Sequence, residues 1–161
     1  MPKITNVSES LIVKTKKSEK FVSKPYKCPS GVCTIGYGTT RYFDTGKKVT
    51  GLDKPINEAE GDRLIRGHFR TVVSPLVDKL CRDDLDQEEF DAIADFIYNA
   101  GATYIDKKGK VQYYNLFVNV NKKLPKAEMV KYWENLAITG GGVKLNGLIA
   151  RRKEEVELYY S

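Results

Sequence analysis

The sequence is poor in the residues that build metal centres and covalent cross-links. Its 161 residues include three cysteines and a single histidine. Cys28, Cys33 and Cys81 show no CxxC spacing, which argues against a disulfide framework or a zinc ribbon and suits a reducing compartment. His68 lies on a predicted helix stripe and is expected to be a packed or surface histidine. These counts and spacings therefore argue against a metal site.

Long apolar runs are also missing. No stretch approaches the roughly 18 apolar residues of a membrane span, so no stable membrane insertion is predicted. Residues 1–5 lead into no apolar segment, so no signal peptide is expected. The chain is predicted to be made in the cytoplasm, and a target outside the cell would require a separate release factor. Gly36 and Gly38 lack the third glycine and the lysine of phosphate-binding loops, which argues against nucleotide binding.

Positive charge is in excess. The formal net charge is +6 and the isoelectric point is about 9.1, which predicts attraction to nucleic acid, an anionic membrane surface or the bacterial envelope. Charge alone does not choose among these. The basic residues are spread along the chain and are not interleaved with aromatics on one element, which argues against a nucleic-acid-binding domain. A nucleic-acid-binding domain stays an alternative function.

The residue composition, and with it the predicted secondary structure, changes along the chain. A short helix is predicted over 9–21, and residues 25–50 have the glycine, threonine and aromatic content of strands and turns, with a strand over 32–38. Helical patterns then dominate. Asn57 and Asp86 are each followed three residues later by a glutamate, which predicts two capped helices. Pro75 is expected to kink or restart the first of them.

Apolar spacing predicts which residues face the core. These are, helix by helix, Leu64, Ile65, Val72, Leu76 and Leu80; Phe90, Ile93, Ala94 and Ile97; Met129, Val130, Trp133 and Leu136; and Leu148, Ile149, Val156 and Tyr159. The fold class predicted is α+β, with residues 1–161 as a single domain. Its approximate lobes are an α/β lobe over 14–60 and a helical lobe over 61–161 plus the N-terminal helix. A ligand cleft is expected at their junction.

One carboxylate stands out by position. Glu19 lies at the end of the first predicted helix, just before the strand region, and so near the junction of the lobes. Partly desolvated by Phe21 and Tyr26, it is a candidate proton donor. Most of the acidic residues are instead expected to be solvated surface groups.

Three segments together resemble one family. Glu19 is followed after eight residues by Cys28 and after five more by Thr34, which opens the run TIGYG. This spacing is similar to the catalytic stretch of the phage-type lysozymes (glycoside hydrolase family 24). Residues 90–101 resemble the cleft-lining helix end of that family, and residues 146–155 resemble its GLxxRRxxE closing helix. The three matches occur in the family's order over most of the chain.

The resemblance implies a lysozyme-like fold, with a small N-terminal lobe carrying a β-hairpin and a larger helical C-terminal lobe. It also implies hydrolysis of the β-1,4 bond between N-acetylmuramic acid and N-acetylglucosamine in peptidoglycan, by a phage endolysin-type monomer that needs a holin for release. Glu19 would be the general acid, and Thr34 would help to hold the attacking water. The family's usual outcome is inversion, and a lytic transglycosylase outcome stays open.

Cys28 departs from the family, in which most members have aspartate at this position. A thiol is largely neutral at neutral pH unless its surroundings favour the thiolate. One hypothesis is that Cys28 is a polarisable hydrogen-bond partner of the water held by Thr34, and the alternative is that it is merely packed. A reversible disulfide with Cys33 is a further possibility that strict geometry makes demanding.

Supporting residues also come from the resemblance. It implies that Gly38, Tyr98 and Asn99 line the substrate site, with plain core packing as the alternative for Tyr98. Arg152 falls on the apolar side of the last helix and therefore needs a carboxylate, for which Glu19 is the candidate; Arg151 is the alternative arginine. A competing function of another class is a phage structural or wall-binding module that keeps the fold but has little catalytic activity.

Overall fold

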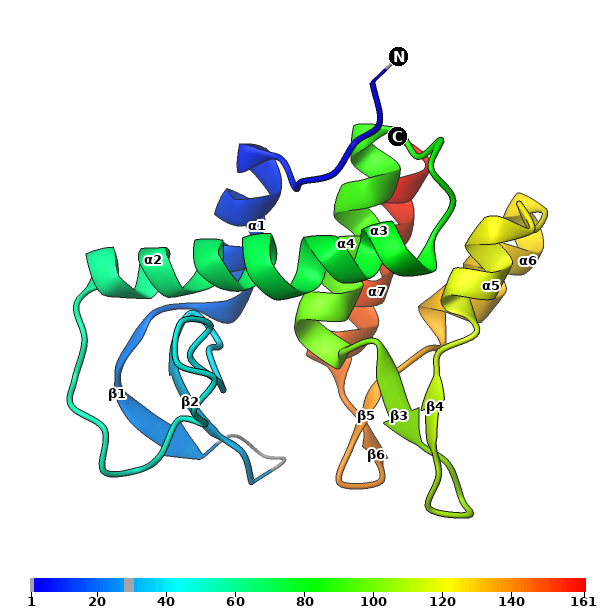
Figure 1. The fold of residues 1–161 in the computed structure, drawn as a ribbon. Coiled ribbons are helices and arrows are strands. Elements are labelled where there is room, and N and C mark those ends of the chain that lie inside the picture. The colour runs from blue at the N-terminus through cyan, green and yellow to red at the C-terminus, as the bar shows by residue number, and fades with distance from the viewer. Residues whose placement is uncertain (1, 28–30) are drawn as a thin grey trace. The chain divides into compact units, whose positions relative to one another are not determined.

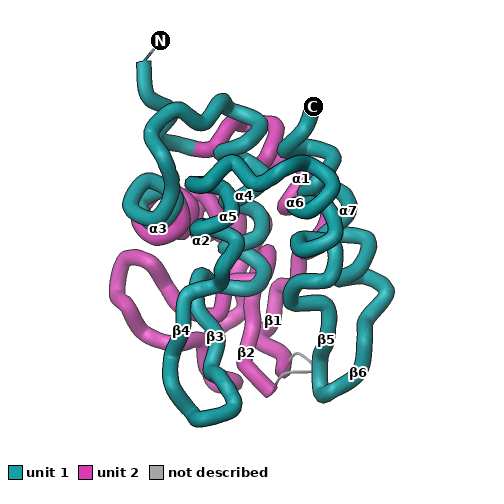
Figure 2. Tube along the Cα trace, turned by 90° about the vertical axis from the view of Figure 1, so that its right-hand side faces the viewer, with its two compact units in different colours: residues 1–6, 74–161 teal, residues 7–73 magenta. Residues whose placement is uncertain are grey.

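The structure is a computed structural model that describes residues 2–27 and 31–161. Cys28 lies outside the described residues, so the structure does not test its role. The chain divides into two compact units, of which unit 2 is Val7–Val73 and unit 1 combines residues 1–6 with residues 74–161 (Figure 2). The lobe limits expected from the sequence stay a prediction.

Unit 2 combines helices with one antiparallel hairpin (Figure 1). Its elements are α1 (Glu9–Glu19), β1 (Val22–Lys27), β2 (Cys33–Gly36), α2 (Glu58–His68) and a π-helical turn, η1 (Phe69–Val73). The Ser8 hydroxyl caps α1 by accepting from the Leu11 amide, and the Asn57 side chain caps α2 by accepting from the Glu60 amide. The N-cap predicted at Asn57 is therefore confirmed.

The apolar stripe of the helix that follows Asn57 is displaced by one residue from the prediction. Leu64 and Ile65 are buried as expected, but Val72 is 39% exposed, whereas Val73 and Val77 are fully buried. The cause is η1, because i→i+5 bonding uses one residue more per turn than an α-helix. Pro75, two residues after the end of η1, supplies no amide donor, which is consistent with a break in regular winding here.

Unit 1 is mainly helical, with two short hairpins. Its elements are α3 (Ser74–Leu80), α4 (Gln87–Ala100), β3 (Thr103–Ile105), β4 (Val111–Tyr113), α5 (Leu116–Asn121), α6 (Lys126–Glu134), β5 (Thr139–Gly140), β6 (Val143–Lys144) and α7 (Asn146–Tyr159). The strand pairs β3–β4 and β5–β6 are both antiparallel. Helices and small antiparallel sheets occur together in the chain, so the predicted α+β class is confirmed.

Helix α4 is the central helix of unit 1 and packs against α7. The predicted inward residues Phe90, Ile93, Ala94 and Ile97 are all buried. A full capping box between Asp86 and Glu89 begins the helix, as the sequence predicted. It ends at Gly101, which has a positive φ of 81°.

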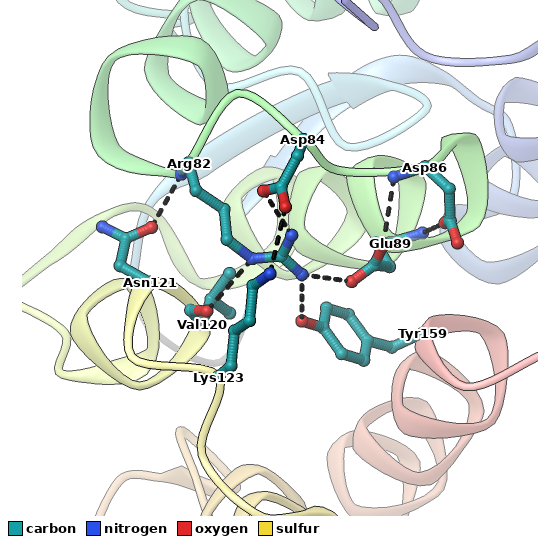
Figure 3. A network of polar contacts seen from close by, with 8 residues as sticks. All are labelled: Arg82, Asp84, Asp86, Glu89, Val120, Asn121, Lys123 and Tyr159. Atoms are coloured by element: carbon teal, nitrogen blue, oxygen red, sulfur yellow. Dashed lines mark hydrogen bonds and ion pairs between the residues drawn. The ribbon is translucent and has the colours of Figure 1, made fainter. Parts of the chain in front are cut away.

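A polar cluster around Arg82 connects the segment before α4 to α5 and α7 (Figure 3). The guanidinium donates to the Val120 carbonyl at 3.2 Å and to Glu89 Oε2 at 2.6 Å, and it also contacts Asp84 and the Tyr159 hydroxyl. The Asn121 side chain accepts from the Arg82 amide at 2.7 Å. One largely buried arginine therefore connects three parts of unit 1.

Candidate functional site

The Glu19 carboxyl lies directly against the backbone of Gly38. A Cβ atom built on Gly38 would lie 2.7 Å from Glu19 Oε2, closer than real Cβ contacts, and a tight 3.0 Å from its Cδ. Gly38 also has a φ of 83°, a backbone conformation that residues other than glycine rarely adopt. Glu19 is the last residue of α1, and Lys20 turns the chain there with a φ of 60°. The half-buried carboxyl is therefore held beside the glycine-rich turn that follows β2.

Thr34 lies in the hairpin that leads to this turn. It pairs with Tyr26 across β1 and β2, is 5% exposed, and donates from its hydroxyl to the Val32 carbonyl at 3.3 Å. The Ile35–Thr39 bridge closes the turn by two main-chain hydrogen bonds. The structure thus brings Glu19 to the segment that carries Thr34 and Gly38. Cys33 is half-buried with a free thiol, and its candidate partner Cys28 lies outside the described residues.

Glycines allow the turn to approach α2 closely. A Cβ on Gly36 would lie 3.2 Å from Ile56 Cδ1 and 3.4 Å from the Gly61 Cα, and one on Gly61 would lie 2.9 Å from the Phe21 ring. The Phe21 and Tyr37 rings contact each other at 5.4 Å. This packing fixes the turn on a rigid helix, which is the condition for holding a carboxyl in a set position.

The other candidate site residues lie in unit 1, where Asn99 is held by Arg152. Arg152 Nη2 donates to Asn99 Oδ1 at 2.6 Å and to Glu155 Oε1 at 2.8 Å. Trp133 Nε1 donates to the second Glu155 oxygen at 3.0 Å. Arg152 is fully buried, so its predicted inward position is confirmed, and its guanidinium lies 4.8 Å from the Phe96 ring centroid. Tyr98 is half-buried.

Arg151 makes a second buried ion pair. Its Nε and Nη2 donate to the two Asp95 oxygens at 3.0 and 2.9 Å, which is a bidentate arrangement. Burial raises the pKa of Glu155 well above its usual range, against the opposing charge of Arg152. Burial also lowers the pKa of Arg152. Among the described residues, Arg152 Nε and Nη1 have no hydrogen-bond partner, so this buried cluster is only partly satisfied.

The sequence reasoning missed Glu155 as the carboxylate that Arg152 contacts. The signal was present in the run RRKEE, because Arg152 and Glu155 are three residues apart and share a helix face. The pairing of Arg152 with Glu19 stays a prediction. The structure brings Asn99, Arg152 and Glu155 together within unit 1, and Glu19 and Gly38 together within unit 2.

The described part of the chain offers neither a metal-binding cluster nor a membrane-spanning helix. Over residues 2–27 and 31–161, no group of three or more His, Cys, Asp or Glu side chains could hold a metal ion. Across the same residues, no helix has the length and apolar character needed to cross a membrane. His68 is half-buried, and burial lowers its pKa from the ordinary value of 6.5.

Comparisons with known sequences point to one family. The sequence model of the family described as phage lysozyme matches residues 16–155. The endolysin of Bacillus phage B103 is 31% identical over 154 residues, which cover 96% of this chain and 54% of that protein. This chain therefore spans about half the length of that relative. The endolysin of Acyrthosiphon pisum secondary endosymbiont phage 1 is 27% identical over 156 residues, covering 97% of this chain and 99% of the relative.

A solved structure shares the fold. The endolysin from Escherichia coli O157:H7 phage FAHEc1 superposes with a TM-score of 0.72 at 23% identity, covering 99% of this chain and 96% of that one. At this identity the likeness bears on the fold alone. It confirms the lysozyme-like architecture expected from the sequence.

Proposed function

The chain belongs to the phage lysozyme family, and from that membership we propose that it is an endolysin-type muramidase. It hydrolyses the β-1,4 bond between N-acetylmuramic acid and N-acetylglucosamine in bacterial peptidoglycan. The observation that supports this most directly is the Glu19 carboxyl packed against Gly38, next to the hairpin that carries Thr34. The family's glycoside hydrolase chemistry needs a fixed carboxyl of this kind.

Glu19 is the general acid in this proposal. Cleavage of a glycosidic bond requires a proton on the leaving oxygen as positive charge develops on the sugar ring. A half-buried carboxyl at the end of a helix, supported by a glycine turn, keeps its oxygens in a fixed position. Glu19 donates the proton, and a water molecule attacks the opposite face of the ring, so the anomeric configuration inverts.

Thr34 and Cys28 hold that water. The Thr34 hydroxyl donates to the Val32 carbonyl, which leaves its oxygen lone pairs as acceptors for a water hydrogen. Cys28 occupies the position at which most family members have aspartate and contributes a weak, polarisable hydrogen-bond partner. The reaction needs no cofactor.

Asn99 and Tyr98 contact the sugar's N-acetyl group, and Gly38 also contributes to substrate binding. Because Arg152 donates to the Asn99 carbonyl oxygen, the amide nitrogen of Asn99 is directed away from Arg152 as a donor. This orientation suits the carbonyl of an acetamido group. Arg152 is a positioning residue, and the Arg151–Asp95 pair supports α4 next to it.

The test is release of new reducing ends from purified peptidoglycan. Wild type is expected to release them, and Glu19→Gln, which keeps the shape but cannot donate the proton, is expected to lose activity by at least about a hundredfold. Glu58→Gln, an exposed glutamate at the start of α2, is the matched control. Full activity of Glu19→Gln would contradict the proposal, and fragment mass would separate hydrolysis from an anhydro product.

Cys28 is tested by three substitutions. Cys28→Asp is expected to retain or raise activity, Cys28→Ser to retain part of it, and Cys28→Ala to reduce it by about tenfold, because the hydrogen-bond partner of the water is lost. An unaffected Cys28→Ala variant would mean that Glu19 and Thr34 act without the thiol.

The proposal also covers where the enzyme acts. It is made in the host cytoplasm as a monomer, reaches the wall through a holin, binds peptidoglycan and has no nucleic-acid partner. A second candidate, a wall-binding module with weak catalysis, is favoured only by the cysteine at position 28. Wall binding without new reducing ends would select that module instead.

A further inference from the structure

The β3–β4 hairpin of unit 1 has two faces of different chemistry. The register pairs Tyr104 with Gln112, and it pairs Ile105 with Val111 next to them. Because opposed residues share a face and successive residues alternate, Tyr104 and Gln112 lie on one face and the Ile105–Val111 pair on the other. The hairpin extends from the end of α4, the helix that carries Asn99 (Figure 1).

The Tyr104 face is connected to Asn99 by direct contacts. The Tyr104 and Tyr114 ring centroids lie 5.0 Å apart at an interplanar angle of 32°, and Tyr114 meets the Phe96 ring edge-on at 5.2 Å. The Arg152 guanidinium lies over Phe96 and donates to Asn99. An unbroken series of contacts therefore runs from the hairpin to the residue proposed to bind an acetamido group.

One side of the Tyr104 ring remains available. Tyr104 is 40% exposed even though Tyr114 covers one ring face. Burial raises the pKa of Tyr132, and the nearby phenols of Tyr104 and Tyr114 add to this effect, so three tyrosines gather at the base of the hairpin. Supported from behind in this way, the exposed ring is a rigid platform with little conformational entropy to lose on binding.

Polar groups next to this ring are already oriented. Gln112 Nε2 donates to Asp106 Oδ2 at 3.2 Å, while Asp106 Oδ1 accepts from the amides of Lys108 and Lys110, both at 2.9 Å. The Gln112 carbonyl oxygen is consequently directed away from Asp106, as an acceptor for an external hydroxyl or amide. An aromatic platform beside a fixed amide suits a sugar ring, which presents C–H groups on its face and hydroxyls at its edge.

The tip of the hairpin carries net positive charge. Residues 106–110 contain three lysines against one aspartate, which gives a formal charge of +2, and all three lysines are exposed. The stem peptides on muramic acid residues carry carboxylates, so the tip is complementary in charge to a glycan strand that bears them.

We propose that Tyr104 and Gln112 form an additional subsite for an N-acetylhexosamine of the peptidoglycan strand, outside the reacting pair of sugars. The inference rests on the proposed muramidase function and extends it. The Tyr104 ring stacks on the sugar face, Gln112 binds a hydroxyl or acetamido group, and the lysines at the tip attract the neighbouring stem peptide. The subsite favours long glycan strands over short fragments.

The two faces of the hairpin provide a matched comparison. Binding of an N-acetylglucosamine hexamer is measured by calorimetry with the full chain carrying Glu19→Gln, so that the probe is not consumed. Adding Tyr104→Ala is expected to weaken binding about fivefold, whereas Tyr104→Phe, which keeps the ring, stays close to the parent. Tyr113→Ala, a change of equal size on the opposite face of the same hairpin, leaves binding unchanged.

Equal weakening by Tyr104→Ala and Tyr113→Ala, or no weakening by either, would overturn the subsite. The subsite would also be overturned if Tyr104→Ala weakened binding to anionic phospholipid vesicles and not to the hexamer, because the hairpin would then contact lipid. The proposed function is judged separately by reducing-end release from wild type. A chain that binds the hexamer through Tyr104 but releases no reducing ends would contradict the muramidase proposal while supporting the sugar site.

Discussion

At the scale of single residues, the tightest constraint on the proposed chemistry is the contact between Gly38 and Glu19. Two separate requirements coincide at this glycine, a positive φ and the absence of a Cβ beside the carboxyl. Substitutions can separate them, because the chain has other glycines that meet the first requirement without the second.

Gly38→Ala is expected to reduce wall hydrolysis by more than about tenfold, because the added methyl group displaces the Glu19 carboxyl. Gly46→Ala is the control, since Gly46 also has a positive φ, of 72°, but a Cβ there meets nothing within 4 Å. Both variants should lose about 1 kcal/mol of stability from backbone strain. Equal loss of activity in the two would show that strain, not the displaced carboxyl, is responsible.

His68 offers a test of burial, because it is the only histidine and gives a single set of ring resonances. Burial lowers its pKa, so NMR titration is expected to give a value below 6.5 in the folded chain. Between the folded and unfolded pKa values, the unfolded chain binds the proton and the folded chain does not. The free energy of unfolding should therefore rise with pH up to about 6.5, and His68→Gln should lack this contribution.

At this scale, the sequence predicted which residues face inward better than it predicted which residues they contact. The inward position of Arg152 followed from helical spacing, which depends only on the local backbone. Its contacts with Asn99 and Glu155 depend on how α4 and α7 pack and on the rotamers chosen there, and neither can be read from spacing. The i,i+3 separation of Arg152 and Glu155 was nevertheless a usable signal.

At the scale of elements, the Arg82 cluster shows how a loop can determine helix packing. Arg82→Met is expected to lower the free energy of unfolding by about 3 kcal/mol, because it leaves the largely buried Glu89 carboxylate without its ion-pair partner and removes one donor to the Val120 carbonyl. Lys123→Met removes another cation that contacts Asp84, but Lys123 is 64% exposed and should cost less than about 1 kcal/mol. Urea unfolding of both variants is the measurement, and similar losses would contradict the argument.

Elements with strong local signals were predicted well. Helix α4 begins at a capping box, which was predicted directly from the sequence, and ends at Gly101. Helix α5 was missed because it has six residues and no side-chain cap bond, so tertiary packing of Leu116, Phe117 and Val120 stabilises it. The antiparallel pairing of β3 with β4 was also not predicted from the sequence.

At the scale of the whole molecule, net charge predicts a dependence on salt. A chain of charge +6 should be attracted to anionic walls, so the apparent KM for intact walls is expected to rise several-fold between low and physiological ionic strength. Binding of a neutral N-acetylglucosamine oligomer serves as the control and should change little. Equal salt sensitivity for both substrates would mean that local site electrostatics, not the net charge, governs the effect.

The architecture could be anticipated from the sequence because several separate motifs agreed in order and spacing. The segment from Glu19 to Thr34, residues 90–101 and residues 146–155 lie far apart in the chain, yet they occur in the family's order. The one-residue displacement at η1 could not be anticipated, since propensity and periodicity carry no signal for an extra residue in a turn.

That π turn has a consequence for how the chain is aligned and engineered. Relatives with regular winding at residues 69–73 should align with this chain only if a gap of one residue is opened there. Deleting one residue within this turn, such as the exposed Arg70, is therefore expected to restore regular α-helical winding and to leave Val77 on the buried stripe, whereas the same deletion in α3 would rotate the residues after it by about 100°. The turn therefore acts as a one-residue insertion in an otherwise regular helix, and a single deletion is the change that tests it.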